Sequence, residues 1–328
     1  MSKAGWIGGD LSKDSIDCCV AFVGESFDRG RKVRHFGRTP AGDDALVAWV
    51  SSVEDLEGIC IESTGRLSIQ FALEVGPRLP VPVSIVEPSR PRQFAKSLGI
   101  KVKNDPVDAR VLAQYGLMIR PRSKALPERS WRELKECTRL REVLREERKG
   151  HVQRLEDGPE SALVCKELRR QVKYLDTRIA SLEAECERLL EQIPEAAADK
   201  SHAMSIPGVG IRTATTLLAE LGNLREYKRG EIIGFAGLYP VEFTSGSSVF
   251  KPPHLAKGGG RRLRRVLYMA ALSARHHCPH LKIFADRLEN EGKKKMVVLG
   301  AVMRKLLLLI RAVVVSGRDY DPAYTPGL

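Results

Sequence analysis

The sequence has few of the features that mark secreted, zinc-binding or membrane proteins. Its 7 cysteines are odd in number and form no Cys-x-x-Cys pair, which argues against a disulfide framework and a zinc site and fits a reducing cytosol. The first ten residues hold no long apolar segment, so we expect no signal peptide. The most apolar stretch, residues 296–315, contains Arg304, Lys305 and Arg311. These charges within the stretch predict a buried helix and not a membrane span. We therefore expect a cytoplasmic protein with no membrane partner.

Acidic residues are scarce only in the last third of the chain. The whole sequence has 54 Lys+Arg and 41 Asp+Glu, a net charge of +13. Residues 1–120 and 121–200 each carry about +1, whereas residues 201–328 hold 20 basic and 9 acidic side chains and so carry +11. This asymmetry predicts a polyanion-binding surface in the C-terminal third. Aromatic residues make up 6% of the chain, and no base-stacking platform stands out among them.

Residues 1–122 alternate strand and helix patterns and predict an α/β domain, a mixed sheet covered by helices. A short apolar run ends at Gly8-Gly9-Asp10, and another at residues 58–61 places Glu62 at its end. Further strands are expected at 16–23, 32–39 and 81–86, with helices at 44–53 and 67–75.

Residues 123–198 predict a helical, densely charged connector, and residues 199–328 a mostly helical C-terminal domain. Gly158-Pro159 separates a helix beginning near Pro127 from a second one. The apolar residues of this second helix repeat at heptad spacing, which fits both a helical hairpin within one chain and a coiled coil between chains. These residues are Leu168, Val172, Leu175, Ile179, Leu182, Cys186, Leu189 and Ile193.

Four carboxylates are candidates for one acidic site. Asp10 and Glu62 each follow an apolar strand, while Asp105 and Asp108 flank Pro106. Since proline suits the first helical position, we expect Asp105 to cap a helix and Asp108 to be its third residue, on the same face. Converging carboxylates repel one another unless a hard cation such as Mg²⁺ or Mn²⁺ neutralises them. The alternative is that these are ordinary capping and turn acids.

Two C-terminal segments are candidates for binding phosphate. Ile206-Pro207-Gly208-Val209-Gly210 looks like a helix-hairpin-helix element, in which Gly208 and Gly210 would let backbone amides approach a phosphate. The basic run that follows later in the chain would add cations, and its residues are Lys257, Arg261, Arg262, Arg264 and Arg265. The alternatives are a turn between packed helices and a solvated charged surface.

Residues 244–248 carry a cluster of hydroxyl groups in the sequence Thr-Ser-Gly-Ser-Ser. A Ser/Gly cluster ordinarily forms a loop. A serine nucleophile would need activation, which metal ions held by the carboxylates would supply. The residues alone do not choose among Ser245, Ser247 and Ser248.

Taken in order, these motifs resemble the insertion-sequence one-ten transposases of the Piv and DEDD type. The resemblance rests on the segments at 7–10, 61–65, 103–109, 206–210, 235–240, 245–248 and 257–268. It implies an N-terminal RuvC-like domain of RNase H fold whose DEDD set falls on Asp10, Glu62, Asp105 and Asp108. It also implies a coiled-coil connector and a C-terminal transposase domain with Ser245 as the nucleophile.

The same resemblance implies a recombinase that joins donor and target DNA under the guidance of a structured non-coding bridge RNA. The resemblance also implies an assembly of four protomers, a dimer of dimers, in which the acids of one protomer meet the serine of another. A second hypothesis is a RuvC-like, metal-dependent junction-resolving nuclease with water as the nucleophile. A third is a DNA-binding protein without catalysis, which the acids at strand ends disfavour.

Overall fold

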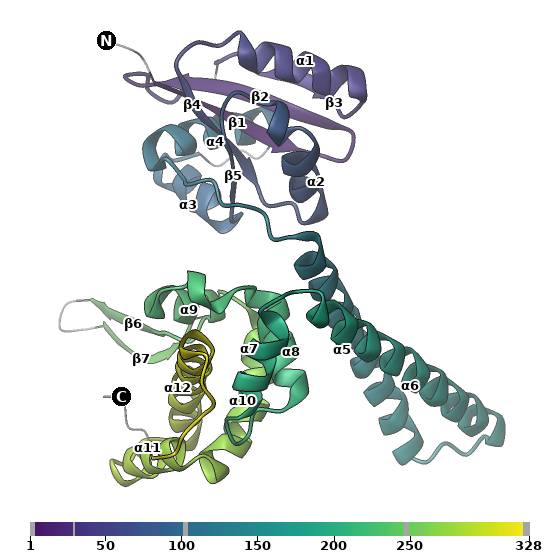
Figure 1. Ribbon diagram of the computed structural model, residues 1–328. Coiled ribbons are helices and arrows are strands. Elements are labelled where there is room, and N and C mark those ends of the chain that lie inside the picture. The colour runs from purple at the N-terminus through teal and green to yellow at the C-terminus, as the bar shows by residue number, and fades with distance from the viewer. Residues whose placement is uncertain (1–3, 29, 101–103, 246–248, 257, 324–328) are drawn as a thin grey trace. The chain divides into compact units, whose positions relative to one another are not determined.

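The structure is a computed structural model that describes residues 4–28, 30–100, 104–245, 249–256 and 258–323, with residues 242–245 and 249–253 described by their backbone alone. The chain divides into two compact units, residues 1–126 and 127–328 (Figure 1). The two helices of the predicted connector belong to the second unit. The predicted boundary at residue 122 falls within the last residues of the first unit.

The first unit is built on a five-stranded mixed sheet, as the sequence predicts. Its strand order is β3-β2-β1-β4-β5, with β1 antiparallel to β2 and parallel to β4. The strands are β1 (Gly5–Leu11), β2 (Ser15–Phe22), β3 (Arg34–Gly37), β4 (Leu56–Glu62) and β5 (Val83–Val86). The helices are α1 (Pro40–Ser51), α2 (Arg66–Glu74), η1 (Gly76–Arg78), α3 (Ser89–Ser97) and α4 (Asp105–Ile119).

The two-residue period of the strands separates two apolar layers. Ile7 and Leu11 of β1 pack with residues of α1 and α2 in one buried cluster. Trp6 packs with α4 residues in a second cluster on the other face of the sheet. Asp10 follows Trp6 and Gly8 at the same period and therefore projects to the α4 face. In β4, Cys60 belongs to the α4 cluster, so Glu62 projects to that face as well.

A glycine in β1 allows α4 to lie directly against the sheet. A Cβ atom at Gly8 would overlap the backbone nitrogen of Ala113 and the backbone oxygen of Ala109. Two residues earlier on the strand, Trp6 meets Gly116, where a Cβ would lie 2.7 Å from the indole. The backbones of β1 and α4 thus touch at Gly8, a contact that any side chain at this position would break.

The second unit is helical apart from one β-hairpin among its described residues. It begins with α5 (Arg129–Glu156) and α6 (Ala162–Glu191), which pack against each other as a helical hairpin (Figure 1). The remaining elements are α7 (Ala196–Met204), α8 (Ile211–Leu221), η2 (Leu224–Glu226), α9 (Arg229–Ala236), β6 (Pro240–Ser245), β7 (Val249–Leu255), α10 (Arg261–His277), α11 (Pro279–Asn290) and α12 (Lys295–Ser316).

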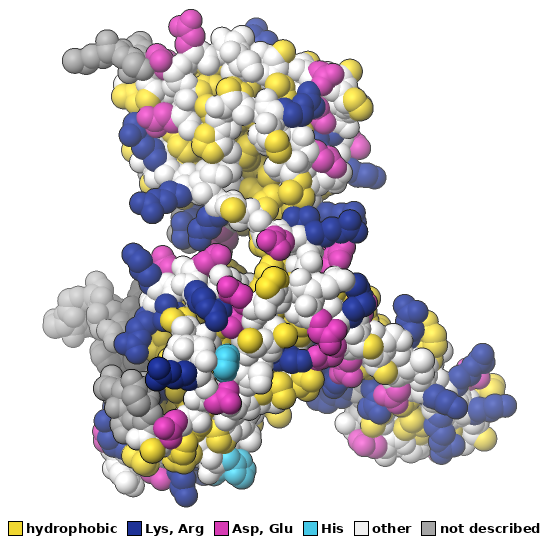
Figure 2. All heavy atoms as spheres, in the orientation of Figure 1, with side chains coloured by type: hydrophobic (Ala, Val, Ile, Leu, Met, Phe, Trp, Pro, Cys, Tyr) yellow, Lys and Arg dark blue, Asp and Glu magenta, His cyan; other side chains and the backbone are white. Residues whose placement is uncertain are grey.

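The heptad residues of α6 are covered within the chain in the half of the helix nearer the core. Leu175, Ile179 and Leu189 are buried, and ion pairs such as Arg148 with Asp176 join α6 to α5. Both basic and acidic side chains lie on the surface of this hairpin in Figure 2. The hairpin within one chain is therefore present, while Leu163 and Tyr174 nearer the start of α6 stay exposed.

A partly buried polar network ties α5 to α8. Glu220 of α8 accepts two hydrogen bonds from Arg139 at 2.8 and 2.9 Å and lies 3.4 Å from the amine of Lys135. Burial alone would raise the pKa of Glu220, but the hydrogen bonds from Arg139 hold it below its ordinary value. The network explains why α5 belongs to the same unit as the C-terminal helices.

No helix that the structure describes combines the length and the apolar character needed to cross a bilayer. The apolar stretch at 296–315 forms α12, whose Leu306, Leu307 and Val314 are fully buried in the core of the second unit. The prediction of a buried helix is confirmed.

We expect Gly8→Ala to destabilise the first unit by about 2 kcal/mol or more, because its methyl group would overlap α4 backbone that cannot move aside. Gly37→Ala is the matched control: it is also a strand glycine, but a Cβ there has nothing within 4 Å. Denaturant unfolding of both variants checks this. Equal stabilities would contradict the packing argument.

Candidate active site

The close packing of α4 on β1 determines where the predicted acids lie. Trp6 of β1 contacts Gly116 of α4, and Gly8, two residues further along the strand, lies against Ala109 and Ala113. The helix therefore runs antiparallel to the strand. Two more strand residues advance about 6.6 Å, which corresponds to about four helix residues at about 1.5 Å each. The first turn of α4, with Asp105 and Asp108, thus lies beside Asp10.

Glu62 reaches the same edge of the sheet from the neighbouring strand. Gly9 of β1 pairs with Ile61 of β4 in parallel register, so Asp10 and Glu62 are the next residues of two adjacent strands. The Glu62 side chain is 19% exposed and lies 3.7 Å from the guanidinium of Arg92 on α3. Sequence analysis missed both α3 and this ion pair, because the helix is short and strongly polar.

The start of α4 differs by one residue from the prediction. Asn104, not Asp105, is the N-cap, and its side chain accepts a 3.0 Å hydrogen bond from the backbone nitrogen of Val107. Asp105 is consequently the first helical residue and Asp108 the fourth. Because Asn104 satisfies the free amide, neither aspartate is needed as the cap.

The negative charges of the other three acids affect the pKa of Asp10. Its carboxyl is half-buried, and its pKa is raised to about 6, first by burial and then by the negative charges of Asp108, Asp105 and Glu62. Burial and nearby negative charges both favour the protonated carboxyl and so raise its pKa. The structure therefore brings the four predicted carboxylates into one electrostatic group.

The donor set fits a hard divalent cation in its chemistry, since all four groups offer carboxylate oxygens and their mutual repulsion is what a cation would relieve. The side chains do not form a finished coordination sphere: among the described residues, no three His, Cys, Asp or Glu side chains are close enough together to hold an ion. Residues 101–103, which precede α4, lie outside the described residues.

The predicted nucleophile lies at the end of a β-strand and not in an irregular loop. The backbone of Ser245 ends β6 and pairs with Val249 of β7. Ser247, Ser248 and Lys257 lie outside the described residues, and the position of the Ser245 side chain is not described either.

The glycine turn between α7 and α8 has a packing role at its first glycine. Gly208 has a φ of +97°, and a Cβ there would lie 2.5 Å from the backbone nitrogen of Ala274 on α10. Gly210, the N-cap of α8, has nothing within 4 Å of its Cβ position. Of the two predicted phosphate-binding glycines, only Gly210 presents open backbone at the helix start.

The four predicted basic residues at the start of α10 divide into two pairs. Arg264 donates to the backbone oxygens of Ala236 and Gly258, and Arg265 forms an ion pair with Glu146 of α5. Arg261 and Arg262 are exposed in the first turn of the helix. Within the described residues, neither of these two has a hydrogen-bonded acid partner. The second pair therefore carries the charge that is available to a polyanion.

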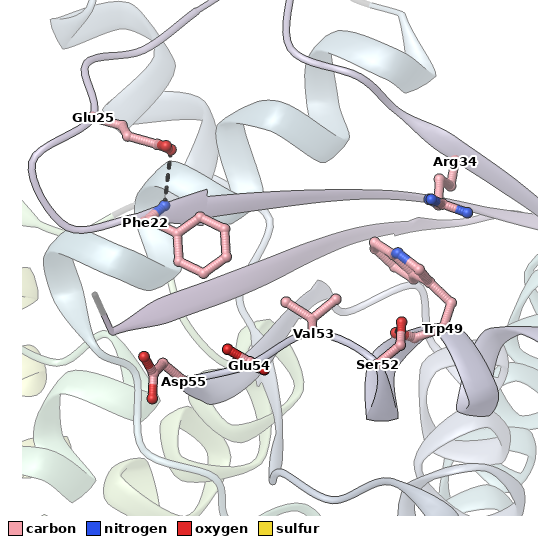
Figure 3. A pocket seen from close by; sticks show the side chains of 8 residues that line it. All are labelled: Phe22, Glu25, Arg34, Trp49, Ser52, Val53, Glu54 and Asp55. Carbon is pink, nitrogen blue, oxygen red and sulfur yellow. Dashed lines mark hydrogen bonds between the residues drawn. The ribbon is translucent and has the colours of Figure 1, made fainter. Parts of the chain in front are cut away.

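One hollow of the first unit lies away from the carboxylates. It has a volume of about 650 Å³ and lies between the end of β2 and the end of α1, lined by residues that include Phe22, Trp49 and Asp55 (Figure 3). Phe22 pairs with Gly5 at the start of β1, five residues before Asp10. This hollow is therefore at the opposite end of the strand from the acidic group.

Comparison with known proteins covers both groups of candidate residues. A DEDD-type IS110 transposase model matches residues 7–157, and a model described as transposase IS116/IS110/IS902 family matches residues 200–286. The chain is 30% identical to the pilin gene-inverting protein of Moraxella lacunata and 28% identical to that of Moraxella bovis, over 98% of both chains in each case. It is 29% identical over 149 residues to an uncharacterized 43.6 kDa protein of insertion element IS110 from Streptomyces coelicolor, which is 45% of this chain and 36% of that one.

We expect Asp10→Asn to raise the midpoint of thermal unfolding by about 3 °C at pH 7.5 in the presence of a chelator, which corresponds to about 1 kcal/mol once solvent screening is allowed for. The pKa of Asp10 is higher in the folded protein than its ordinary value, so its charge costs stability above pH 6. That cost fades as the pH falls towards 4.

The matched control is Asp14→Asn, an exposed carboxyl in the turn that follows β1, which should change the midpoint little at either pH. Added Mg²⁺ should stabilise the unsubstituted protein more than Asp10→Asn, because the ion stabilises the state that binds it. A lower midpoint for Asp10→Asn with chelator, or a gain that does not depend on pH, would contradict the clustering of charges.

Proposed function

This chain belongs to the IS110 family of transposases, and from that premise we propose a recombinase that cuts and rejoins DNA strands through a covalent link between Ser245 and DNA. Asp10, Glu62, Asp105 and Asp108 form its acidic centre. The proposal is supported by the register of β1 with β4 and the close packing of α4, which lead these four residues towards one end of the sheet, and by the raised pKa of Asp10.

The strand exchange needs no external energy source. In cleavage, the Oγ of Ser245 forms a bond to the backbone phosphorus while the bond to the 3′ oxygen breaks, so that the DNA strand ends in a free 3′-hydroxyl. In rejoining, the 3′-hydroxyl of the exchanged strand forms a bond to that phosphorus and the bond to Ser245 breaks. One ester is exchanged for another in each step, so the number of phosphoester bonds is conserved.

The four carboxylates would hold Mg²⁺, or Mn²⁺ in its place. When bound, such an ion stabilises the negative charge that develops on the phosphate oxygens. The chain supplies the frame: β1 and β4 fix Asp10 and Glu62, and the glycine contact at Gly8 holds the first turn of α4 against them. Arg92 lies beside Glu62, and its positive charge offsets part of the negative charge of the four carboxylates when no ion is bound.

The nucleic-acid partners follow from family membership and charge. We propose that donor and target DNA, together with a structured guide RNA, bind the basic C-terminal third, with Gly210, Arg261 and Arg262 among the contacts. Backbone contacts of this kind read no base sequence, which fits a system in which RNA pairing supplies the specificity. We propose further that the active form is an assembly of four protomers, in which the serine of one meets the acids of another.

The alternative is a junction-resolving nuclease that uses the same acids with water as the nucleophile. It is consistent with the acidic group and leaves Ser245 without a chemical role. The two mechanisms differ in their products, since hydrolysis releases free DNA ends and leaves no protein on the DNA.

We expect Ser245→Ala to abolish a covalent protein–DNA adduct while leaving the affinity for DNA and RNA unchanged, because only the attacking hydroxyl is removed. The assay uses DNA that carries the gene with its flanking sequence, RNA transcribed from that flank, and Mg²⁺. Denaturing gels detect the adduct. Ser247→Ala and Ser248→Ala are the matched controls and should retain it. An adduct with Ser245→Ala would overturn the serine assignment, and cut ends without any adduct would favour the nuclease.

We expect Glu62→Gln and Asp108→Asn, made singly, to lower the rate of adduct formation by at least about 100-fold, a loss typical for removal of one group that stabilises transition-state charge. DNA affinity measured with chelator should hold, because the acids do not attract phosphate. Asp14→Asn serves again as the control. Full activity in both variants would indicate a role in folding alone.

A further inference from the structure

The hairpin that carries Ser245 is joined to the helical core through a contact between two glycine segments. Gly237, just past the end of α9, has a φ of +65°, and a Cβ there would overlap the Gly258 oxygen and the Arg264 guanidinium. Gly259 has a φ of +84°, and its Cβ would lie 2.7 Å from the Phe235 oxygen. Gly260 donates a 2.8 Å hydrogen bond to that same oxygen. The two backbones are therefore in direct contact.

Arg264 donates hydrogen bonds to both of these backbone segments. Its Nη1 donates to the Ala236 oxygen at 3.1 Å and to the Gly258 oxygen at 2.8 Å. The Ala236 carbonyl belongs to the last turn of α9, where carbonyls lack helical partners and a cation is favoured. One guanidinium nitrogen thus joins the end of α9 to the segment that follows β7.

The fastened segments flank both strands of the hairpin. β6 begins at Pro240, three residues after Gly237, and β7 ends at Leu255, three residues before Gly258. Between strands and junction, the backbone nitrogen of Ala256 donates to the Tyr239 oxygen at 3.1 Å. Only the chain between Leu238 and Ala256 lies beyond the junction, and Ser245 lies within it.

A small movement at this junction becomes a large one at the serine. Five residues of strand separate Pro240 from Ser245, about 16 Å at the usual rise. A tilt of about 5° at the root would displace the end of β6 by about 1.4 Å over that length. Misplacement of a reacting group by about 1 Å can cost about 100-fold in rate.

We propose that Arg264 is a positioning residue for the serine nucleophile and not a nucleic-acid contact. The inference rests on the proposed role of Ser245, through which Arg264 would act. It changes the sequence-based expectation for Arg264, which grouped this residue with the phosphate-binding cations. Arg261, exposed in the same turn of α10, keeps that expected role and supplies the matched control.

The test compares Arg264→Gln, Arg264→Lys and Arg261→Gln in the full-length protein with the DNA, RNA and Mg²⁺ of the adduct assay. For Arg264→Gln we expect adduct formation at saturating DNA to slow by about 100-fold, with DNA affinity and its salt dependence unchanged. Arg264→Lys should recover part of the rate, since an ammonium reaches one carbonyl but lacks the planar guanidinium. Arg261→Gln should weaken binding and lower the salt slope by about one, an effect that we do not expect of Arg264→Gln.

Hydrogen exchange gives a readout that does not depend on chemistry. In Arg264→Gln, amides of residues 240–256 should exchange faster while those of α10 and α12 stay protected. If Arg264→Gln does not fold, Gly237→Ala tests the same junction with Arg264 in place, and it should slow adduct formation similarly.

Two results would overturn the inference: a loss of affinity and salt slope in Arg264→Gln like that of Arg261→Gln with an unchanged saturated rate, or no change in rate and exchange. Failure of the proposed function is distinguishable from both. In that case Ser245→Ala would retain the adduct, or the unsubstituted protein would cut DNA without forming one, whatever Arg264→Gln does.

Discussion

The backbone contact between Gly8 and α4 is the constraint on which the acidic centre depends. Asp105 and Asp108 are 95 or more residues away from Asp10 in sequence, and no ion pair could bring together groups that repel one another. Apolar packing brings these residues together instead. Trp6, Cys60, Ala109 and their neighbours bury the α4 face of the sheet, and the energy of that burial holds four like charges at its edge.

The second unit also contains a close backbone contact that glycines allow, here at the base of the β6–β7 hairpin. Gly237 and Gly259 allow two backbones to touch, and Arg264 closes the contact with two hydrogen bonds. The acids and the serine are therefore each held by backbone contacts that side chains would prevent. The charges of the two units are arranged differently. In the first unit like charges are grouped at the site, whereas in the second the buried Glu220 is paired with Arg139 and Lys135.

Much of the first unit could be predicted from its sequence because buried strands leave a clear apolar signal, and Glu62 at the end of one of them was found this way. The β6–β7 hairpin was missed, since Pro252 and Pro253 lie within β7 and a Ser/Gly-rich sequence separates β6 from β7, both of which argue against a strand. Asn104 took the cap expected of Asp105 because both residues suit that position. The packing roles of Gly8 and Gly208 depend on residues more than 60 positions away, which no local pattern reveals.

The most direct measurement of the central claim is the identity of the residue joined to DNA. The protein is allowed to react with DNA, RNA and Mg²⁺, the DNA and protein are then digested, and mass spectrometry locates the peptide that retains a nucleotide. The account predicts one modified peptide, with the nucleotide on Ser245, and no such peptide when Asp10 is replaced by Asn. A nucleotide on any other residue, or cleaved DNA with no modified peptide, would contradict it.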